Sequence, residues 1–158
     1  MTPERLHSLL KYTSETGLFT WAVIRRGCRI GSVAGCRMKS GYITIRLDDE
    51  LFYAHRLVWL YVHGRWPIDQ LDHIDGNRAN NKLSNLREVS NLENAQNIRG
   101  PKSKNRSCFL GVRKENSKWL AEIKVNYKPI RIGLFATPEE AHEAYILTKR
   151  RLHAKNTL

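Results

Sequence analysis

The sequence predicts an α+β protein with a strand-rich N-terminal part and a C-terminal part built on one sheet. In the first part, short segments that alternate apolar and polar residues are separated by turn residues and helix signals. In the second part, three alternating segments precede one capped helix, which predicts a three-stranded antiparallel sheet packed on that helix. We expect domains at residues 1–98 and 108–158, joined by a basic linker without periodicity at 99–107.

The N-terminal elements follow from local signals. Thr2 and Pro3 suit the cap and first position of a helix, and the apolar spacing after them predicts a short helix that ends near Tyr12. Residues 16–21 form a turn that feeds a strand, residues 42–47 and 51–53 form two strands around a turn, and residues 54–63 form a helix that Gly64 ends.

The centre of the chain combines an acid, a histidine and several asparagines with strand and turn signals. An apolar run at 68–71 predicts the end of a strand, and Asp72 and His73 close that run. Next come a turn at 75–77, a polar loop with Asn80, Asn81 and Asn85, a returning strand at 86–89, and a helix that begins at Asn91 behind the capping box of Ser90 and Glu93.

These residue types suit metal-assisted hydrolysis of a phosphodiester. A Mg²⁺ ion prefers oxygen ligands and is often held by only one or two protein groups, which leaves room for water and phosphate. Asp72 supplies a charged oxygen and Asn94 a neutral one. His73 has the side chain that best takes a proton from water near pH 7, and the amide oxygen of Asn85 can hold its imidazole N–H.

This segment resembles the metal motif of HNH endonucleases, in the branch found in phage- and intron-encoded homing enzymes. The resemblance implies a ββα-metal core at about 68–97, with His73 as general base and Asn85 as the residue that orients it. It also implies Asp72 and Asn94 as ligands of one Mg²⁺ or Mn²⁺ ion per active site. The matching residues are His55-Arg56-Leu57-Val58-Trp59, Asp72-His73-Ile74-Asp75-Gly76-Asn77, Asn85-Leu86-Arg87, Glu93-Asn94-Ala95 and the opening Thr16-Gly17-Leu18-Phe19-Thr20-Trp21.

Not every residue of this motif requires a catalytic role. Turn chemistry by itself explains residues 75–77, but it does not explain the acid, the histidine and the two asparagines in register. A calcium loop fits less well, because counting Gly76 as its sixth position puts Leu71 and Lys82 where carboxylates are needed. His55 either approaches the active site or, as we favour, packs beneath the motif as a structural histidine. Asn94 replaces the last histidine of the motif's name, which disfavours soft metals.

The C-terminal part has clear strand and helix signals. Strands are expected at 109–114, 118–125 and 129–135, and a helix begins at Thr137-Pro138. The second strand should place Trp119, Ala121, Ile123 and Val125 on one face and Leu120, Glu122 and Lys124 on the other. The helix should bury a stripe made of Ala141, Ala144, Tyr145, Thr148 and Leu152. The positive charges of Lys149, Arg150 and Arg151 should complement the dipole at the C-terminal end of the helix.

This part resembles the plant ethylene-response-factor (APETALA-type) DNA-binding domain, which also occurs in mobile HNH endonucleases. The resemblance implies that the sheet contacts DNA, and a sheet of this size fits the major groove. Arg131 stands where the plant domains have tryptophan and Leu110 where they have arginine, so the plant target sequence is not carried over. The expected DNA-binding residues are Arg113, Lys114, Trp119, Glu122, Lys124 and Arg131, and the matching residues are Gly111-Val112-Arg113, Lys118-Trp119, Ala121-Glu122-Ile123-Lys124, Ile132-Gly133, Phe135, Thr137, Glu139-Glu140-Ala141 and Ala144-Tyr145.

The positive charge is concentrated in the last third of the chain. Residues 99–158 hold 14 Lys/Arg and 5 Asp/Glu, a net charge of +9, whereas residues 1–98 carry +3 of the total of +12. Such a concentration points to a polyanionic partner. We expect no membrane span and no secretory signal, and cysteines 28, 36 and 108 contain no C-x-x-C pair. The expected compartment is the cytoplasm, that of a bacterial host if a phage encodes the chain.

Together these features predict a metal-dependent DNA endonuclease of the homing or mobile-element kind that acts on double-stranded DNA. It would make either a single-strand nick or a double-strand cut, as a monomer or as a dimer. Three alternatives stay open: a DNA-binding regulator with a relic nuclease domain, a nuclease without sequence preference, and a ribonuclease. The complete set of Asp72, His73, Asn85 and Asn94 favours an active nuclease over a relic.

Overall fold

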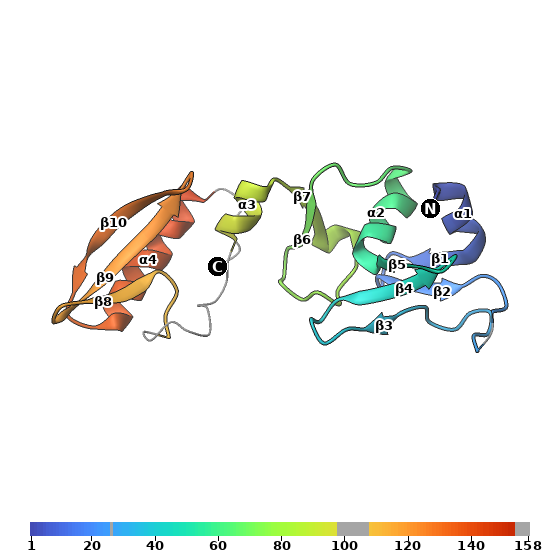
Figure 1. The fold of residues 1–158 in the computed structure, drawn as a ribbon, viewed down its shortest axis with the longest axis horizontal. Helices are drawn as coiled ribbons and strands as arrows, with labels where there is room; N and C mark the ends of the chain where they lie inside the picture. The colour runs from blue at the N-terminus through green and yellow to red at the C-terminus, as the bar shows by residue number, and fades with distance from the viewer. Residues whose placement is uncertain (26, 98–107, 154–158) are drawn as a thin grey trace. The chain divides into compact units, whose positions relative to one another are not determined.

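A computed structural model describes residues 1–25, 27–97 and 108–153. The chain divides into two compact units, Met1–Val89 and Ser90–Leu158, and each is described by itself (Figure 1). The expected basic linker at 99–107 lies outside the described residues. The helix that follows Ser90, which we expected within the nuclease domain, is grouped with the second unit. Within the described residues no helix is long and apolar enough to cross a membrane.

The first unit consists of three small antiparallel sheets and two α-helices (Figure 1). The sheets have the strand orders β1-β2, β3-β4-β5 and β6-β7. In chain order the elements are α1 (Pro3–Leu9), β1 (Leu10–Thr13), β2 (Leu18–Trp21), β3 (Cys36–Arg37), β4 (Ile43–Leu47), β5 (Glu50–Tyr53), α2 (Ala54–His63), β6 (Gln70–His73), the 3-10 turn η1 (Leu83–Asn85) and β7 (Leu86–Val89).

Several expected elements of this unit are confirmed. Helix α2 has the expected bounds, and Gly64 ends it in the left-handed region at φ 67°. The Thr2 hydroxyl caps α1 by accepting a hydrogen bond from the Arg5 amide. A single core joins α1, α2 and the first two sheets, and it includes Leu6, Leu10, Phe19, Trp21, Ile45, Leu47, Leu57, Val58 and Leu60.

Two expected boundaries are wrong. The first helix ends at Leu9 and not near Tyr12, because Leu10–Thr13 pairs with β2 and buries Leu10 against the core. The strand expected over 68–71 begins at Gln70, and the Ile68 side chain is 85% exposed. The Glu88 carboxylate instead accepts hydrogen bonds from the backbone amides of Ile68 and Asp69, which holds this stretch outside the strand.

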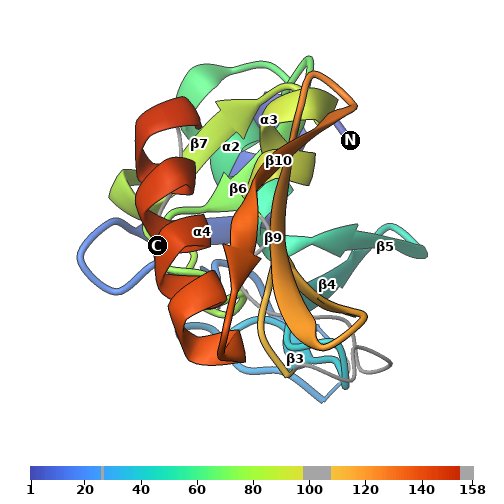
Figure 2. The same cartoon turned by 90° about the vertical axis from the view of Figure 1, so that its left-hand side faces the viewer.

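The second unit has the expected order of elements: α3 (Asn91–Gln96), β8 (Val112–Glu115), β9 (Lys118–Val125), β10 (Lys128–Phe135) and α4 (Pro138–Leu152). The sheet is antiparallel with the order β10-β9-β8, and α4 runs along one of its faces (Figure 2). The capping box of Ser90 and Glu93 is present at α3, and the Thr137 hydroxyl caps α4. The core consists of Val112, Ala121, Ile123, Ala141 and Tyr145.

The details of this core differ from the expected stripe. Ala141, Tyr145 and Lys149 are the buried residues of α4, whereas Leu152 is 46% exposed. Positions four residues apart lie on one helix face, so the line from Ala141 continues to Lys149 and not to Leu152. Strand β8 begins at Val112, three residues later than expected, because Gly111 adopts φ 74° where the chain turns against the Tyr145 ring.

Candidate active site and nucleic-acid interface

The β6–β7 hairpin carries the candidate catalytic residues of the first unit. Asp72 is paired with Arg87 and His73 with Leu86. Successive side chains on a strand point to opposite faces, so Asp72 and His73 belong to different sides of the hairpin. The His73 side chain is only 3% exposed, and Asp72 is half-buried.

The imidazole of His73 is enclosed by polar and aromatic side chains. Its Nε2 lies 3.1 Å from Oδ1 of Asn81, a residue that is itself 2% exposed. Its ring lies edge-on to His55, with the centroids 5.1 Å apart, and 6.0 Å from the ring of Tyr42. His73 is therefore held in one orientation by a hydrogen bond and by ring packing.

The expected contact from Asn85 to His73 is replaced by a different one. The Asn85 amide oxygen accepts from the Asp75 backbone N–H at 3.0 Å. Its amide nitrogen donates to the Asp75 carboxylate and to the Asn80 carbonyl, both at 2.9 Å. Asn85 thus closes the loop between the two strands, and among the hydrogen bonds of the described residues the partner of His73 Nε2 is Asn81.

Asp75 also serves this loop. Its carboxylate accepts from the Asn80 and Asn85 amide groups and from the Asn77 backbone N–H. Desolvation raises the pKa of Asp75, but these hydrogen bonds outweigh it and hold the pKa below its ordinary value. Asn77, Asn80 and Asn85 therefore stabilise the ionised carboxylate of Asp75. Hydrogen bonds made by the side chains of Asp75, Asn80 and Asn85 hold both the turn and the loop in shape.

Asp72 lies in a two-point ion pair. Arg87 donates to Oδ2 of Asp72 from Nη2 at 2.8 Å and from Nε at 3.2 Å, and both side chains are mostly buried. The carboxylate is a hard oxygen donor of the kind that Mg²⁺ prefers. Within residues 1–25, 27–97 and 108–153, no group of three or more His, Cys, Asp or Glu residues could hold a metal. A cation at Asp72 would therefore depend on amide oxygens, water and phosphate for its other ligands.

Asn94, the second expected ligand, lies on α3 in the second unit. Its backbone N–H donates to the Ser90 carbonyl at 3.0 Å, within the first turn of that helix. The capping box fixes where the helix begins and so fixes the position of Asn94 on it.

His55 packs beside His73 from the start of α2. It is 7% exposed, and its Nδ1 has no hydrogen-bond partner within the described residues. Burial, followed by the charges of His73 and Arg56, lowers the pKa of His55 to about 3, so this imidazole is neutral at physiological pH. The rings of Tyr42 and Tyr53 lie 5.3 and 5.5 Å from it. His55 is thus both a packed histidine and a neighbour of the candidate base.

No signal in the sequence singled out Asn81 as the partner of His73 or Tyr12 as a contact of Asn81. Asn81 stood in a loop with two other asparagines, and no local signal separated it from Asn80 or Asn85. Tyr12 was placed at the end of a helix, yet its hydroxyl contacts the Asn81 carbonyl at 3.0 Å across 69 residues of chain.

In the second unit, strand pairing sorts the expected DNA-binding residues into two faces of the sheet. Arg113 is paired with Leu120, Glu122 with Arg131, and Lys124 with Pro129. The intervening residues Ala121 and Ile123 pack on α4, so Arg113, Glu122, Lys124 and Arg131 share the opposite face. We call this the helix-free face.

Lys114 and Trp119 lie on the other side of the sheet. They are paired with each other, and Trp119 shares the face of Ala121 and Ile123, where it packs at the margin of the core. The Lys114 Nζ lies 6.0 Å from the centroid of the Trp119 ring. Lys114 is exposed and Trp119 is half-buried. The six expected residues therefore do not form one continuous surface.

The arginines of the helix-free face are exposed but not isolated. Arg131 Nη2 lies 2.8 Å from Oε2 of Glu115, and Arg113 Nη2 lies 4.0 Å from Oε1 of the same carboxylate. Both arginine side chains are 57% exposed. Ion pairs at such exposure contribute little stability, so a phosphate or a base edge can displace Glu115 at small cost.

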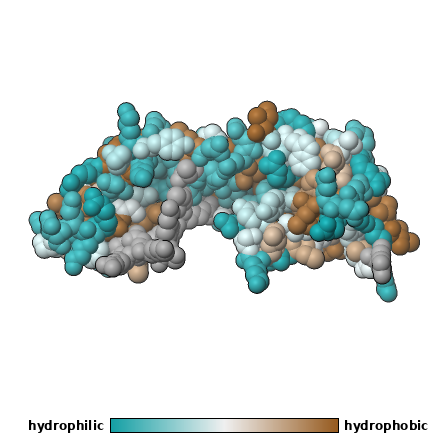
Figure 3. Space-filling view, in the orientation of Figure 1, coloured by the Kyte–Doolittle hydropathy of each residue, from teal (hydrophilic) through white to brown (hydrophobic). Residues whose placement is uncertain are grey.

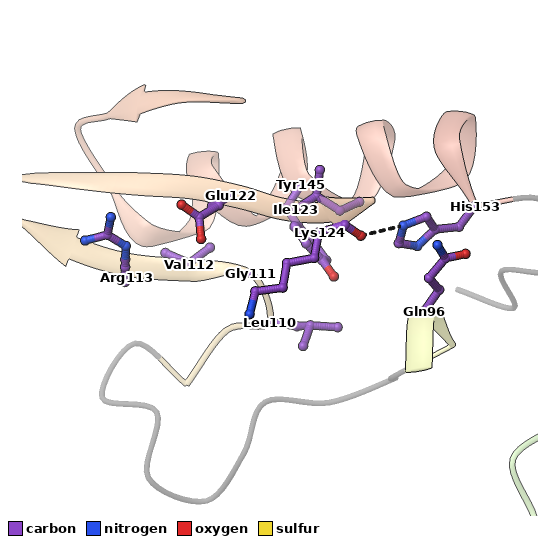
Figure 4. A pocket seen from close by; sticks show the side chains of 10 residues that line it. All are labelled: Gln96, Leu110, Gly111, Val112, Arg113, Glu122, Ile123, Lys124, Tyr145 and His153. Carbon is purple, nitrogen blue, oxygen red and sulfur yellow. Dashed lines mark hydrogen bonds between the residues drawn. The ribbon is translucent and has the colours of Figure 1, made fainter. Parts of the chain in front are cut away.

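An apolar hollow adjoins this face at the start of β8. It has a volume of about 330 Å³, and Val112, Ile123 and Tyr145 line it together with Arg113 and Lys124 (Figure 4). The Nε2 of His153 lies 3.2 Å from the Lys124 carbonyl at one end of the hollow (Figure 4). On the side of the second unit that Figure 3 shows, hydrophilic surface predominates over apolar surface.

The segment that carries the first candidate site matches a known protein family. A model of the HNH endonuclease family matches residues 52–96, a segment that includes Asp72, His73, Asn85 and Asn94. Residues 52–96 are therefore similar to the HNH endonuclease family. The chain is 32% identical over 117 residues to an uncharacterized HNH endonuclease of Acanthamoeba polyphaga mimivirus, and this match covers 72% of the chain and 59% of that protein.

Two further proteins resemble parts of this chain. It is 43% identical over 75 residues to an ethylene-responsive transcription factor of Medicago truncatula, a match that covers 44% of the chain and 32% of that protein. A solved structure of the HNH homing endonuclease I-HmuI, concerned with its DNA binding and cleavage, is 28% identical with a TM-score of 0.44, and the match covers 56% of this chain and 51% of that one. The chain therefore spans between about a third and three fifths of the length of these relatives.

Proposed function

We propose that the chain is a metal-dependent, site-directed DNA endonuclease that hydrolyses phosphodiester bonds. The observation that carries the proposal is His73, a buried and oriented imidazole within the segment that matches the HNH family model, with Asp72 as the preceding residue of the same strand. A carboxylate that can hold a divalent metal and an imidazole that can take a proton suit metal-assisted attack of water on a phosphodiester, and a viral HNH endonuclease is among the relatives.

In this proposal His73 is the general base. It takes a proton from the water molecule that attacks the phosphorus atom, and its hydrogen bond to Asn81 and the packing of His55 hold the ring in place. Arg87 orients the Asp72 carboxylate through two hydrogen bonds. Asn85 acts indirectly, by closing the loop on which Asn81 lies.

Asp72 and Asn94 are the residues proposed to hold one Mg²⁺ or Mn²⁺ ion. The carboxylate and amide oxygens of these two side chains are suitable donors for a hard cation. Such an ion neutralises charge that develops on the phosphate and on the leaving oxygen. Both ligand assignments rest on the motif.

The C-terminal sheet is proposed to bind double-stranded DNA and to select the cleavage site. Its helix-free face presents three cations, Arg113, Lys124 and Arg131, around Glu122. The APETALA-type resemblance and the match to a plant transcription factor support this role. Lys114 and Trp119, on the other face, are proposed to contact the DNA backbone from the margin of the sheet. We expect a monomer that nicks one strand, with a dimer that cuts both strands as the alternative.

The test is cleavage of supercoiled plasmid by the full chain. We expect conversion to open circles or linear DNA with Mg²⁺ or Mn²⁺, and none with EDTA. Asp72→Ala should lower both the rate and the metal affinity measured by calorimetry, whereas Asp69→Ala, an exposed acid three residues away, should change neither. If the chain binds DNA but no divalent metal supports cleavage, the protein is instead a DNA-binding regulator with a relic nuclease domain.

A further inference from the structure

We propose that Asn81 is the positioning residue of His73, and that the hairpin of β1 and β2 locks Asn81 in place. The inference rests on the proposed function, because it takes His73 as the general base. It assigns a role to the N-terminal hairpin, for which the nuclease motif itself gives none.

The first step concerns which nitrogen of His73 carries the proton. Nε2 lies 3.1 Å from the Asn81 amide oxygen, which can only accept a hydrogen bond. Nε2 therefore carries the hydrogen in the neutral ring, and Nδ1 has the lone pair. Asn81 thus selects the tautomer in which Nδ1 is the nitrogen that accepts the proton from water.

Burial makes this contact effective. Asn81 is 2% exposed and His73 is 3% exposed, so bulk water does not compete for the hydrogen bond between them. The other two asparagines of the loop have different partners. Asn80 donates to the Asp75 carboxylate at 2.7 Å, and Asn85 contacts Asp75 and the Asn80 carbonyl. Asn81 is therefore the asparagine of this loop that serves the histidine.

Tyr12 of β1 fixes the backbone on both sides of Lys82, the residue that follows Asn81. Its hydroxyl donates to the Asn81 carbonyl and accepts from the Leu83 N–H, each at 3.0 Å. Burial raises the pKa of Tyr12, so the hydroxyl stays protonated and can donate. One side chain therefore spans the peptide groups at which the loop enters η1.

Gly17 holds the same stretch from the turn between β1 and β2. It adopts φ 74°, and a Cβ atom placed there would lie 2.5 Å from the Lys82 backbone nitrogen and 2.7 Å from the Asn81 carbonyl carbon. Only glycine lets the hairpin approach the Asn81–Lys82 peptide so closely. Tyr12 and Gly17 are independent contacts from one hairpin to one peptide, and that peptide carries the side chain that orients the base.

Three substitutions in the full-length protein test the proposal. Asn81→Leu removes the acceptor, Asn81→Asp keeps an acceptor oxygen at a similar position, and Tyr12→Phe removes both hydroxyl contacts. Tyr61→Phe is the matched control, because the Tyr61 ring packs in the same aromatic cluster. We measure kcat and KM for plasmid cleavage, and the tautomer of His73 by long-range ¹H–¹⁵N NMR of the metal-free protein.

Asn81→Leu should lower kcat by about 10- to 100-fold with little change in KM, the range seen when residues that orient active-site groups are lost. It should also populate the tautomer with the proton on Nδ1. Asn81→Asp should restore the Nε2–H tautomer and most of kcat, and Tyr12→Phe should lower kcat less than Asn81→Leu does. Tyr61→Phe should behave like the wild type.

The proposal is overturned if His73 keeps the Nε2–H tautomer in Asn81→Leu, or if kcat is unchanged in that variant. Should Asn81→Leu fail to fold, Tyr12→Phe and Asn81→Asp supply the same comparison, and a Tyr12→Phe variant with wild-type kcat and tautomer overturns the role of the hairpin. If the wild type cleaves no DNA, the proposed function fails, but the NMR measurement still decides which nitrogen Asn81 engages.

Discussion

The candidate functional side chains of the two units differ in burial and in how firmly they are held. In the first unit His73 is buried and held by Asn81, and Asp72 is held by Arg87. In the second unit Arg113 and Arg131 are each 57% exposed and share a single carboxylate. Proton transfer and charge stabilisation require groups that are already oriented before the reaction. Recognition of a polyanion instead suits long exposed side chains that can exchange one partner for another.

Each unit also buries a histidine, His55 in the first and His153 in the second. His55 adjoins the candidate base, whereas His153 follows α4 and contacts the Lys124 carbonyl of β9. Burial lowers the pKa of both.

Removing the base should have the greatest consequence. His73→Ala should reduce the cleavage rate by about 100- to 10,000-fold, the range for loss of a general base. DNA affinity in a gel shift should stay the same, because the proposed binding residues lie in the other unit. His63→Ala, at the exposed end of α2, serves as the control and should cleave normally. Wild-type turnover by His73→Ala would remove His73 from the mechanism.

Gly111→Ala should destabilise the second unit and leave the stability of the first unit unchanged. Its Cβ would lie 2.0 Å from the Tyr145 ring at φ 74°, so steric overlap adds to backbone strain. We expect a loss of about 2–4 kcal/mol in the unfolding free energy of the second unit, from overpacking together with a left-handed alanine.

Gly64→Ala is the matched control in the first unit, since it has a similar φ of 67° and nothing within 4 Å. It should cost only the strain, about 1–2 kcal/mol. Chemical denaturation measures both variants. Equal losses would mean that the Tyr145 ring moves aside without cost.

The pH dependence of stability should reveal His55. The pKa of this imidazole is 6.5 in the unfolded chain and about 3 in the folded unit, so the unfolded state binds more protons below pH 6.5. Stability is therefore complete above pH 6.5 and falls as the pH drops toward 3, by up to about 1.4 kcal/mol per pH unit. Denaturation of the first unit at several pH values between 4.5 and 7 measures this slope.

His55→Gln should flatten that slope, whereas His63→Gln should leave it as it is. The carboxylate of Asp75 does not interfere in this range, because its pKa lies below its ordinary value of 3.8. A slope in His55→Gln equal to that of the wild type would show that another group is responsible, and His153→Gln would then be the next variant.

A more modest change is expected on the helix-free face. Arg131→Ala should weaken binding to the preferred DNA site by about 1–3 kcal/mol if the side chain pairs with a guanine edge, and should relax the preference at that base. Arg151→Ala, on α4 and away from this face, should weaken binding to all sequences alike or not at all. Competition gel shifts with randomised sites decide between these outcomes. An unchanged preference in Arg131→Ala would transfer base recognition to other residues.

Local signals in the sequence were enough to specify several elements. The bounds of α2 follow from its apolar periodicity and from Gly64, the start of α3 from its capping box, and β9 from its alternation. These signals depend on residues within one or two turns of each other, so they operate before any tertiary contact forms. Local signals also predicted that Asp72 and His73 lie at the end of one strand, β6.

Contacts between distant segments became visible only in the folded chain. Leu10–Thr13 became a strand because β2 was available to pair with it, and Lys149 became buried because the stripe of α4 faces the sheet. The hydrogen-bond partner of His73 depends on the contacts that Tyr12 and Gly17 make with the Asn81–Lys82 peptide. Tyr12 and Asn81 are 69 residues apart in the chain. The three asparagines of the loop have equal hydrogen-bonding capacity, so their chemistry alone could not show which of them bonds to His73. The position of the β1–β2 hairpin decides this, because it selects which asparagine amide can reach the His73 imidazole.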